Sequence, residues 1–218
     1  MTIDEAFQFV LLCAGKDFRG ALKPSDFNRL APIAQIEAIS DRIGNVKRLN
    51  GRLMPQYGYK ANRKIVSELR LYLEGPVDLP VVGGEASYPN GYFYPDAMFT
   101  PDYKRIEMID SDEYPAVKHS LIYPPDAEHP YAVFYGDYIL IDPADTQVKF
   151  TYIKYPPDPV WAYTGTINPV YDPDNSQDFT GDRSLHLEIC RKILKYVGVH
   201  LDADHLTTFA KLEEQTGA

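Results

Sequence analysis

The chain has 218 residues, of which 44% are hydrophobic and 24% charged, and its formal net charge at pH 7 is −9. Its best apolar candidate for a membrane span, residues 7–14, is shorter than the roughly 18 residues that a bilayer needs, and it follows Asp4 and Glu5 instead of a basic region, so we expect neither a membrane protein nor a secreted one. The net negative charge also argues against wholesale binding to nucleic acid.

The N-terminal end is predicted to be helical. Thr2 and Glu5 have capping-box spacing ahead of apolar residues at helical intervals, so a first helix is expected over residues 3–14. A second helix is expected to begin at Pro24-Ser25-Asp26 and to stop at Gly44. Pro32 implies either a kink within it, or a short turn at residues 25–30 before a helix that begins at Pro32.

A basic segment follows. Residues 45–59 are predicted to be a loop, and residues 61–73 a third helix that is ended by Gly75-Pro76. The segment between Gly44 and Arg70 contains seven basic residues and one acidic residue. This positive charge fits either a surface that binds a partner in one orientation or an ordinary solvated surface. The seven are Lys47, Arg48, Arg52, Lys60, Arg63, Lys64 and Arg70.

The middle of the chain is rich in β-branched and aromatic residues that alternate with others, which is typical of strands. Residues 131–155 predict a meander with a turn at Asp142-Pro143-Ala144-Asp145, and Pro156-Pro157 ends the sheet after Tyr155. Further short strands are expected at 77–82, 88–93, 103–109 and 117–123. Asn90-Gly91 is a hairpin signal. One helical turn is expected within 95–103, and a helix start or a loop at 110–113.

Residues 158–183 have little periodicity and are predicted to be a long irregular arm. Its aromatic residues Trp161, Tyr163, Tyr171 and Phe179 are expected to pack against another surface. A helical stripe from Leu185 to Val197, and a final helix capped by Asp202, then form a hairpin. Because neither stripe is wide enough to be stable alone, we expect the hairpin to dock on the N-terminal helices.

The predicted fold class is therefore α+β, with a central antiparallel β region, a meander or barrel, flanked by N-terminal and C-terminal helices that pack together. Four parts are expected: a helical part at 1–75, the β region at 76–157, the arm at 158–183 and the helical hairpin at 184–218. Seventeen tyrosines and eighteen prolines favour a protein that works in an assembly, because tyrosine offers a large contact area with a polar tip.

Signatures of catalysis or metal binding are weak. The two cysteines, Cys13 and Cys190, lie far apart with no CxxC or histidine spacing, and they are interpreted as buried small hydrophobes in a reducing compartment. Three groups match such signatures only in part. They are a calcium-loop spacing at Asp172, Asp174, Ser176 and Asp178, which lacks the glycine and the final glutamate of that loop; a cluster at His200, Asp202, Asp204 and His205, which also fits a helix cap; and the carboxylates Asp110, Asp112 and Glu113, which also fit an exposed acidic turn. No catalytic residue, metal or cofactor is predicted.

Four soft motifs occur in a fixed order along the chain. They are Asp26-Phe27-Asn28 with Gln35; Tyr-Ile-Lys-Tyr-Pro-Pro at the end of the β region; Ser176-Gln177-Asp178-Phe179; and the helix link from Gly198 to Leu201. In this order they resemble the head-tail connector proteins of short-tailed bacteriophages, nearest the ring or adaptor proteins of crAss-like phages and more distantly the tail tubular adaptor proteins.

The resemblance implies a structural virion protein, not an enzyme, that forms a ring, with twelve copies expected, below the portal protein. Such a ring extends the DNA channel, passes DNA without sequence-specific binding, docks further ring or tail proteins, and assembles in the host cytoplasm. The seven basic residues would then face the portal or a neighbour, and the arm would reach an adjacent subunit. Two rivals remain: a monomeric module that binds carbohydrate or protein through Tyr88, Tyr92 and Tyr94, and a small hydrolase that uses Asp110 or Glu113.

Overall fold

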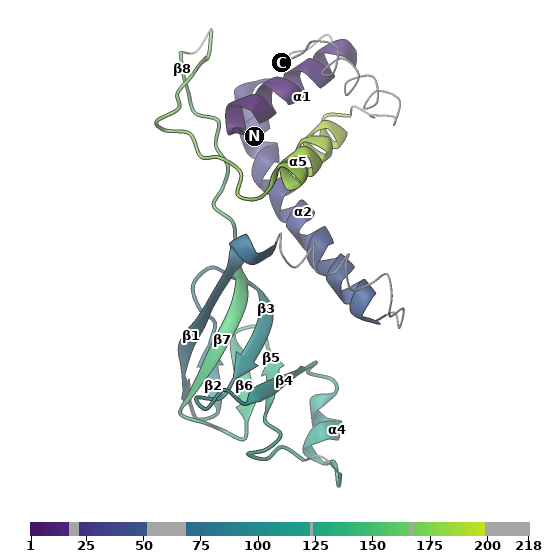
Figure 1. Cartoon of the computed structure of the whole chain (residues 1–218), viewed down its shortest axis with the longest axis vertical. Coiled ribbons are helices and arrows are strands. Elements are labelled where there is room, and N and C mark those ends of the chain that lie inside the picture. Colours follow the sequence, from purple (N-terminus) through teal and green to yellow (C-terminus); the bar gives the residue numbers. More distant parts are fainter. Residues whose placement is uncertain (18–21, 52–68, 123, 166–167, 199–218) are drawn as a thin grey trace. The chain divides into compact units, whose positions relative to one another are not determined.

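The computed structural model describes residues 1–17, 22–51, 69–122, 124–165 and 168–198 (Figure 1). The chain divides into two compact units. One contains the segments 1–71 and 156–218, and the other contains residues 72–155. Each unit is described by itself below. The fold class is α+β as predicted, with helices from both ends of the chain in contact with one another and a β-barrel between them in the sequence.

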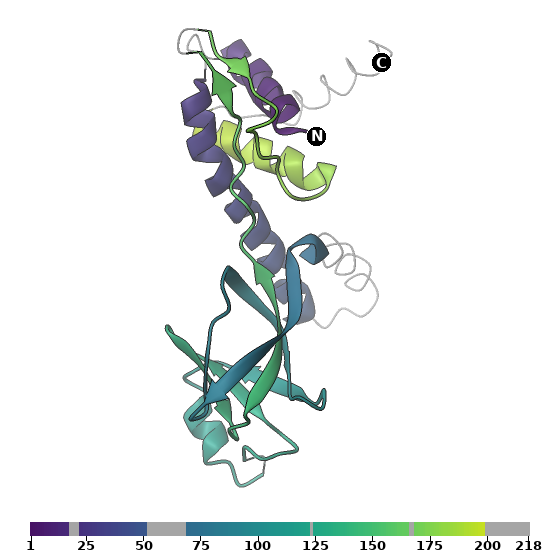
Figure 2. The same ribbon diagram turned by 90° about the vertical axis from the view of Figure 1, so that its left-hand side faces the viewer.

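The helical unit contains α1 (Ile3–Asp17), α2 (Pro24–Gly51) and α5 (Arg183–Tyr196), and α5 packs against both α1 and α2 (Figure 2). The capping box of α1 is confirmed: the Thr2 amide donates to Oε2 of Glu5 at 3.0 Å, and the Glu5 amide donates to Oγ1 of Thr2 at 3.2 Å. The core of this unit is built from apolar side chains of the three helices, among them Ile3, Phe7, Val10, Phe27, Ala31, Ala34, Ala38, Leu185, Ile189 and Ile193.

The second helix continues past both predicted interruptions. It is helical through Pro32, so neither a short turn before that residue nor a helix that begins there is found, and it runs on beyond Gly44 to Gly51. The prediction of a loop from residue 45 was therefore wrong for residues 45–51. A glycine inside a helix costs only about 1 kcal/mol relative to alanine, and proline about 3 kcal/mol, so burial of a long apolar stripe can outweigh both.

The second unit is a closed barrel of seven strands in the order β1-β2-β6-β5-β4-β3-β7 (Figure 1). The strands are β1 (Leu73–Val82), β2 (Glu85–Ser87), β3 (Tyr92–Phe99), β4 (Arg105–Ile109), β5 (Tyr131–Phe134), β6 (Tyr138–Asp142) and β7 (Gln147–Lys154). All neighbours pair antiparallel except β4 and β5, which are parallel and are joined by a crossover that holds α4 (Tyr114–Lys118). The sheet is thus mixed.

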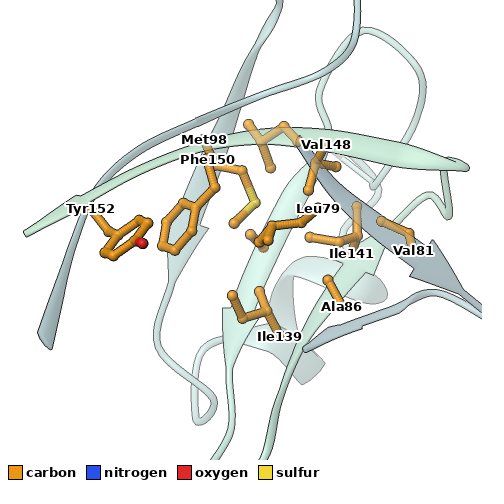
Figure 3. Packing of buried hydrophobic residues seen from close by; sticks show 11 residues of the cluster. Leu79, Val81, Ala86, Met98, Ile139, Ile141, Val148, Phe150 and Tyr152 are labelled. Carbon is orange, nitrogen blue, oxygen red and sulfur yellow. The ribbon is translucent and has the colours of Figure 1, made fainter. Parts of the chain in front are cut away.

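Alternate side chains of the strands fill the barrel. In β7, Val148, Phe150 and Tyr152 point inward between more exposed neighbours, the two-residue period expected of a half-buried strand. Figure 3 shows these residues packed with Leu79, Met98, Ile139 and Ile141 from other strands. The predicted meander from residue 131 to residue 155 and its turn at Asp142-Pro143 are confirmed as β5, β6 and β7.

Several local predictions for this region were wrong. The third helix does not extend to residue 73, because Arg70–Tyr72 is a 3-10 turn (η1) and Leu73 already begins β1, which runs through Gly75-Pro76; residues 61–68 lie outside the described part. Asn90-Gly91 makes a turn but joins strands that do not pair, whereas Gly83-Gly84, both with positive φ, closes the β1–β2 hairpin. Residues 95–99 are strand, and residues 117–118 belong to α4.

Candidate assembly surfaces

The predicted arm begins by packing on the helices of its own chain. The Trp161 side chain is 3% exposed, and its ring lies 4.4 Å from the ring of Phe7 between centroids. Its backbone amide donates to Oδ1 of Asn28 at 2.9 Å, while Nδ2 of Asn28 donates to the Trp161 carbonyl at 3.0 Å. Asn28 therefore satisfies both backbone groups of a buried residue, as an added strand would.

The end of the arm is also fixed to this unit. The Ile3 amide donates to Oδ1 of Asp178 at 2.6 Å, and the buried Phe179 ring lies 5.8 Å from the ring of His186. Asp182 then caps α5 by accepting a hydrogen bond from the Leu185 amide. Both ends of the arm are thus held by α1, α2 and α5.

The four predicted arm residues fall into two pairs. Trp161 and Phe179 are buried within their own chain, whereas Tyr163 is exposed and Tyr171 is half-buried. The rings of Tyr163 and Tyr171 stack on Trp161 at 5.7 and 5.6 Å, from the short strands β8 (Tyr163–Thr164) and β9 (Val170–Tyr171). A contact with a neighbouring subunit stays a prediction, and Tyr163 is the more exposed of these two tyrosines.

The seven basic residues are only partly placed. Lys47 and Arg48 belong to the last two turns of α2, and Arg70 is exposed in η1. Arg52, Lys60, Arg63 and Lys64 lie outside the described residues. Their role at a portal or neighbour interface stays a prediction.

The residues considered for metal binding or catalysis serve local structure where they are described. Asp172 accepts hydrogen bonds from the amide and side chain of Asn175, which lower the pKa of its carboxyl group, and Ser176 donates to the Asp172 carbonyl. Asp110, Asp112 and Glu113 are exposed in the turn before α4. The described part of the chain contains no group of three or more His, Cys, Asp or Glu residues that could bind a metal. The segment from His200 to His205 lies outside it.

The tyrosines of the rival binding-module hypothesis are all half-buried. The Tyr88 ring stacks on Tyr92 with centroids 4.7 Å apart, and Tyr92 in turn lies 5.9 Å from Phe150 in the barrel core. The Tyr88 hydroxyl donates to the Tyr135 carbonyl at 2.6 Å, and burial raises the pKa of Tyr92. Tyr88 and Tyr92 therefore contribute to the barrel interior.

Two of the most exposed large apolar side chains in the described part of the barrel unit lie elsewhere, and the sequence reasoning missed them. Leu121 is 100% exposed and Ile122 is 78% exposed in the crossover that follows α4. Residues 117–123 were predicted to be a strand, whose apolar side chains would have been partly covered. An exposed pair of this kind is a common mark of a contact surface.

The helix beside this pair is held to the barrel by polar contacts. The Tyr114 hydroxyl donates to Oδ2 of Asp142 at 2.6 Å, and Nζ of Lys118 lies 5.3 Å from the centre of the Tyr114 ring. Burial, and then the hydrogen bond to Asp142, raise the pKa of Tyr114, while the interaction with Tyr114 raises the pKa of Lys118. Lys118 is thus cationic next to the exposed pair.

None of the helices in the described ranges is long and apolar enough to cross a bilayer. No protein-family model matches the chain, and no curated protein is significantly similar to it.

Proposed function

We propose that this protein is a structural subunit of the head-tail connector of a short-tailed bacteriophage, arranged in a ring below the portal protein. The proposal combines the order of segments described from the sequence with one structural observation. The barrel has a buried apolar core of its own, yet Leu121 and Ile122 are exposed to solvent on the same unit. Apolar side chains that are not buried within their own chain favour a protein that buries them against neighbouring subunits.

The charge of the chain supports the same role. An acidic ring wall lets DNA pass without binding to it, and a locally basic segment can dock on an acidic surface of the portal or of a neighbour. Because exposed charges are screened by salt, neutralising Lys60, Arg63 and Lys64 together should weaken assembly most strongly at low ionic strength.

Electron microscopy of the purified protein at high concentration, alone and mixed with the portal protein of the same genome, tests the proposal. Rings of about a dozen copies that stack on the portal are the expected result. Uniform monomers that ignore the portal would overturn it, and glycan and protein binding to the barrel would then be measured instead.

A further inference from the structure

The barrel unit carries an apolar projection. Leu121 and Ile122, here called the knob, follow α4 and have exposed fractions of 100% and 78%. A fully exposed Leu121 cannot fill any pocket of its own chain. Lys118 and His119 precede it, and neither has a carboxylate partner within ion-pair distance among the described residues.

The same unit carries a pocket of about 250 Å³. Its floor is formed by Ile106 of β4 and Ile141 of β6, both almost fully buried, and its apolar wall includes Pro130 and Pro143. Since an apolar cavity of about 150 Å³ can hold a benzene molecule, this pocket has room for an aliphatic side chain.

The surroundings of the pocket extend the apolar surface. Tyr103, in the β3–β4 turn next to the lining residues Asp102 and Lys104, is 66% exposed. Val82, the last residue of β1, is 79% exposed, and Gly84 in the turn that follows it lies close to the pocket residue Ala144. The four most exposed large apolar side chains in the described part of the barrel unit are therefore the two of the knob and these two, which lie in segments next to lining residues of the pocket.

The charges around the two features are complementary. Asp102 and Asp145 line the pocket without an ion-pair partner in the described part of the chain, while its cation, Lys104, is paired with Glu128 at 2.8 Å. The pocket rim is therefore net acidic, and Lys118 places a positive charge three residues before Leu121. Opposite charges at the rim of an apolar contact favour one orientation of the partners.

We propose that the knob of one copy inserts into the pocket of the next copy. This inference rests on the proposed ring and gives it a contact between subunits. The knob and the pocket are different surfaces, so a pair of copies joined by this contact still has one free knob and one free pocket. Further copies can therefore add head to tail until the ring closes. Lys118 and His119 then lie near Asp102 and Asp145 of the neighbouring copy.

Self-association of substituted proteins tests the contact. Leu121→Asp places a carboxylate in an apolar, acidic-rimmed pocket and is expected to weaken association by more than about tenfold in analytical ultracentrifugation. Leu12→Asp is the matched control, because Leu12 is 52% exposed on α1 and belongs to neither the knob nor the pocket, and it should leave association unchanged. Circular dichroism checks that both variants are folded.

Disulfide trapping tests the pairing directly. Leu121→Cys and Ala144→Cys proteins, one of them carrying a mass tag, are mixed and oxidised, and the expected product is a covalent heterodimer that neither variant forms alone. The parent protein controls for Cys13 and Cys190. Rings in the microscope without the heterodimer would overturn the knob contact and leave the ring intact. A dominant Leu121→Cys homodimer would also overturn it, and the absence of any association would overturn both proposals.

Discussion

The indole Nε1 of Trp161 donates a hydrogen bond to Oδ1 of Asp4 at 2.8 Å, although 157 positions separate the two residues in the sequence. Trp161 lies just after the chain leaves the barrel, and Asp4 is in the first turn of α1. This bond, together with the two bonds of Asn28 to the Trp161 backbone, joins the segment that follows the barrel in the sequence to α1 and α2 within the helical unit.

Replacing Asn28 by alanine is expected to destabilise the helical unit. The substitution leaves the buried amide and carbonyl of Trp161 without their partner, and each unsatisfied group costs about 1 to 3 kcal/mol. We expect a loss of about 2 to 4 kcal/mol in the free energy of unfolding, measured by urea denaturation followed through Trp161 fluorescence, since Trp161 is the only tryptophan.

Asn28→Asp is the control for this prediction. It keeps the oxygen that accepts from the Trp161 amide but lacks the Nδ2 donor, so it should fall between the parent and Asn28→Ala. Equal stability of all three proteins would show that the arm is not held in this way.

The parts of the fold that follow from local patterns were predictable. The capping box, the stripe of α5 and the alternation in β7 each depend on residues close in the sequence, and each is confirmed. The stop at Gly44 and the alternative of a new helix at Pro32 were wrong, because the packing that offsets the cost of these residues comes from α5, far along the chain.

The barrel closure and the candidate surfaces were harder to predict. β1 pairs with β7, and β4 pairs in parallel with β5, and such long-range pairings leave no short-range sequence signal. The knob was missed because Leu121 and Ile122 have the composition of a strand, and only the crossover after α4 shows that they are uncovered. Conversely, Trp161 and Phe179 look like interface residues in sequence but are buried in their own unit.

Gly75 is expected to be intolerant of any side chain. Its φ is +108°, and a Cβ there would lie 2.5 Å from the Phe150 carbonyl oxygen, where β1 is irregular against β7. Gly75→Ala should therefore lower the free energy of unfolding of the barrel by about 2 to 4 kcal/mol in chemical denaturation.

Gly136 provides a matched comparison in the same unit. A Cβ there meets nothing within 4 Å and its φ is not positive, so Gly136→Ala should be neutral or stabilising by up to about 1 kcal/mol. Similar losses for both variants would contradict the steric explanation.

The ion pair between Arg42 and Glu188 joins α2 to α5. The Arg42 side chain is 10% exposed and that of Glu188 is 36% exposed, so the pair is only partly screened by water. Glu188→Ala removes a partner of a nearly buried charge and should cost about 1 to 3 kcal/mol in urea denaturation. Glu188→Gln keeps a hydrogen-bond acceptor and should cost less; an equal loss would mean that packing and not charge is responsible.

His186 should make the stability of the helical unit depend on pH. Its ring is buried against Phe179, and neither ring nitrogen has a hydrogen-bond partner in the described part of the chain. Burial, and then the charge of the N-terminal amine, lower the pKa of His186 below its ordinary value of 6.5, with the Met1 backbone and then Asp182 and Asp178 opposing part of this effect. At a pH between the two pKa values, His186 is therefore protonated in the unfolded chain and neutral in the folded protein.

The contribution of His186 is fully present above about pH 6.5 and is lost as pH falls through the lowered pKa of the folded state. The free energy of unfolding of the parent should therefore decrease between about pH 7 and pH 5, a range above the titration of ordinary carboxylates. His186→Phe keeps a flat ring against Phe179 but cannot titrate, so its stability should change less over this range in urea denaturation. If both proteins show the same pH dependence, the decrease arises from other groups, and His186 is not responsible for it.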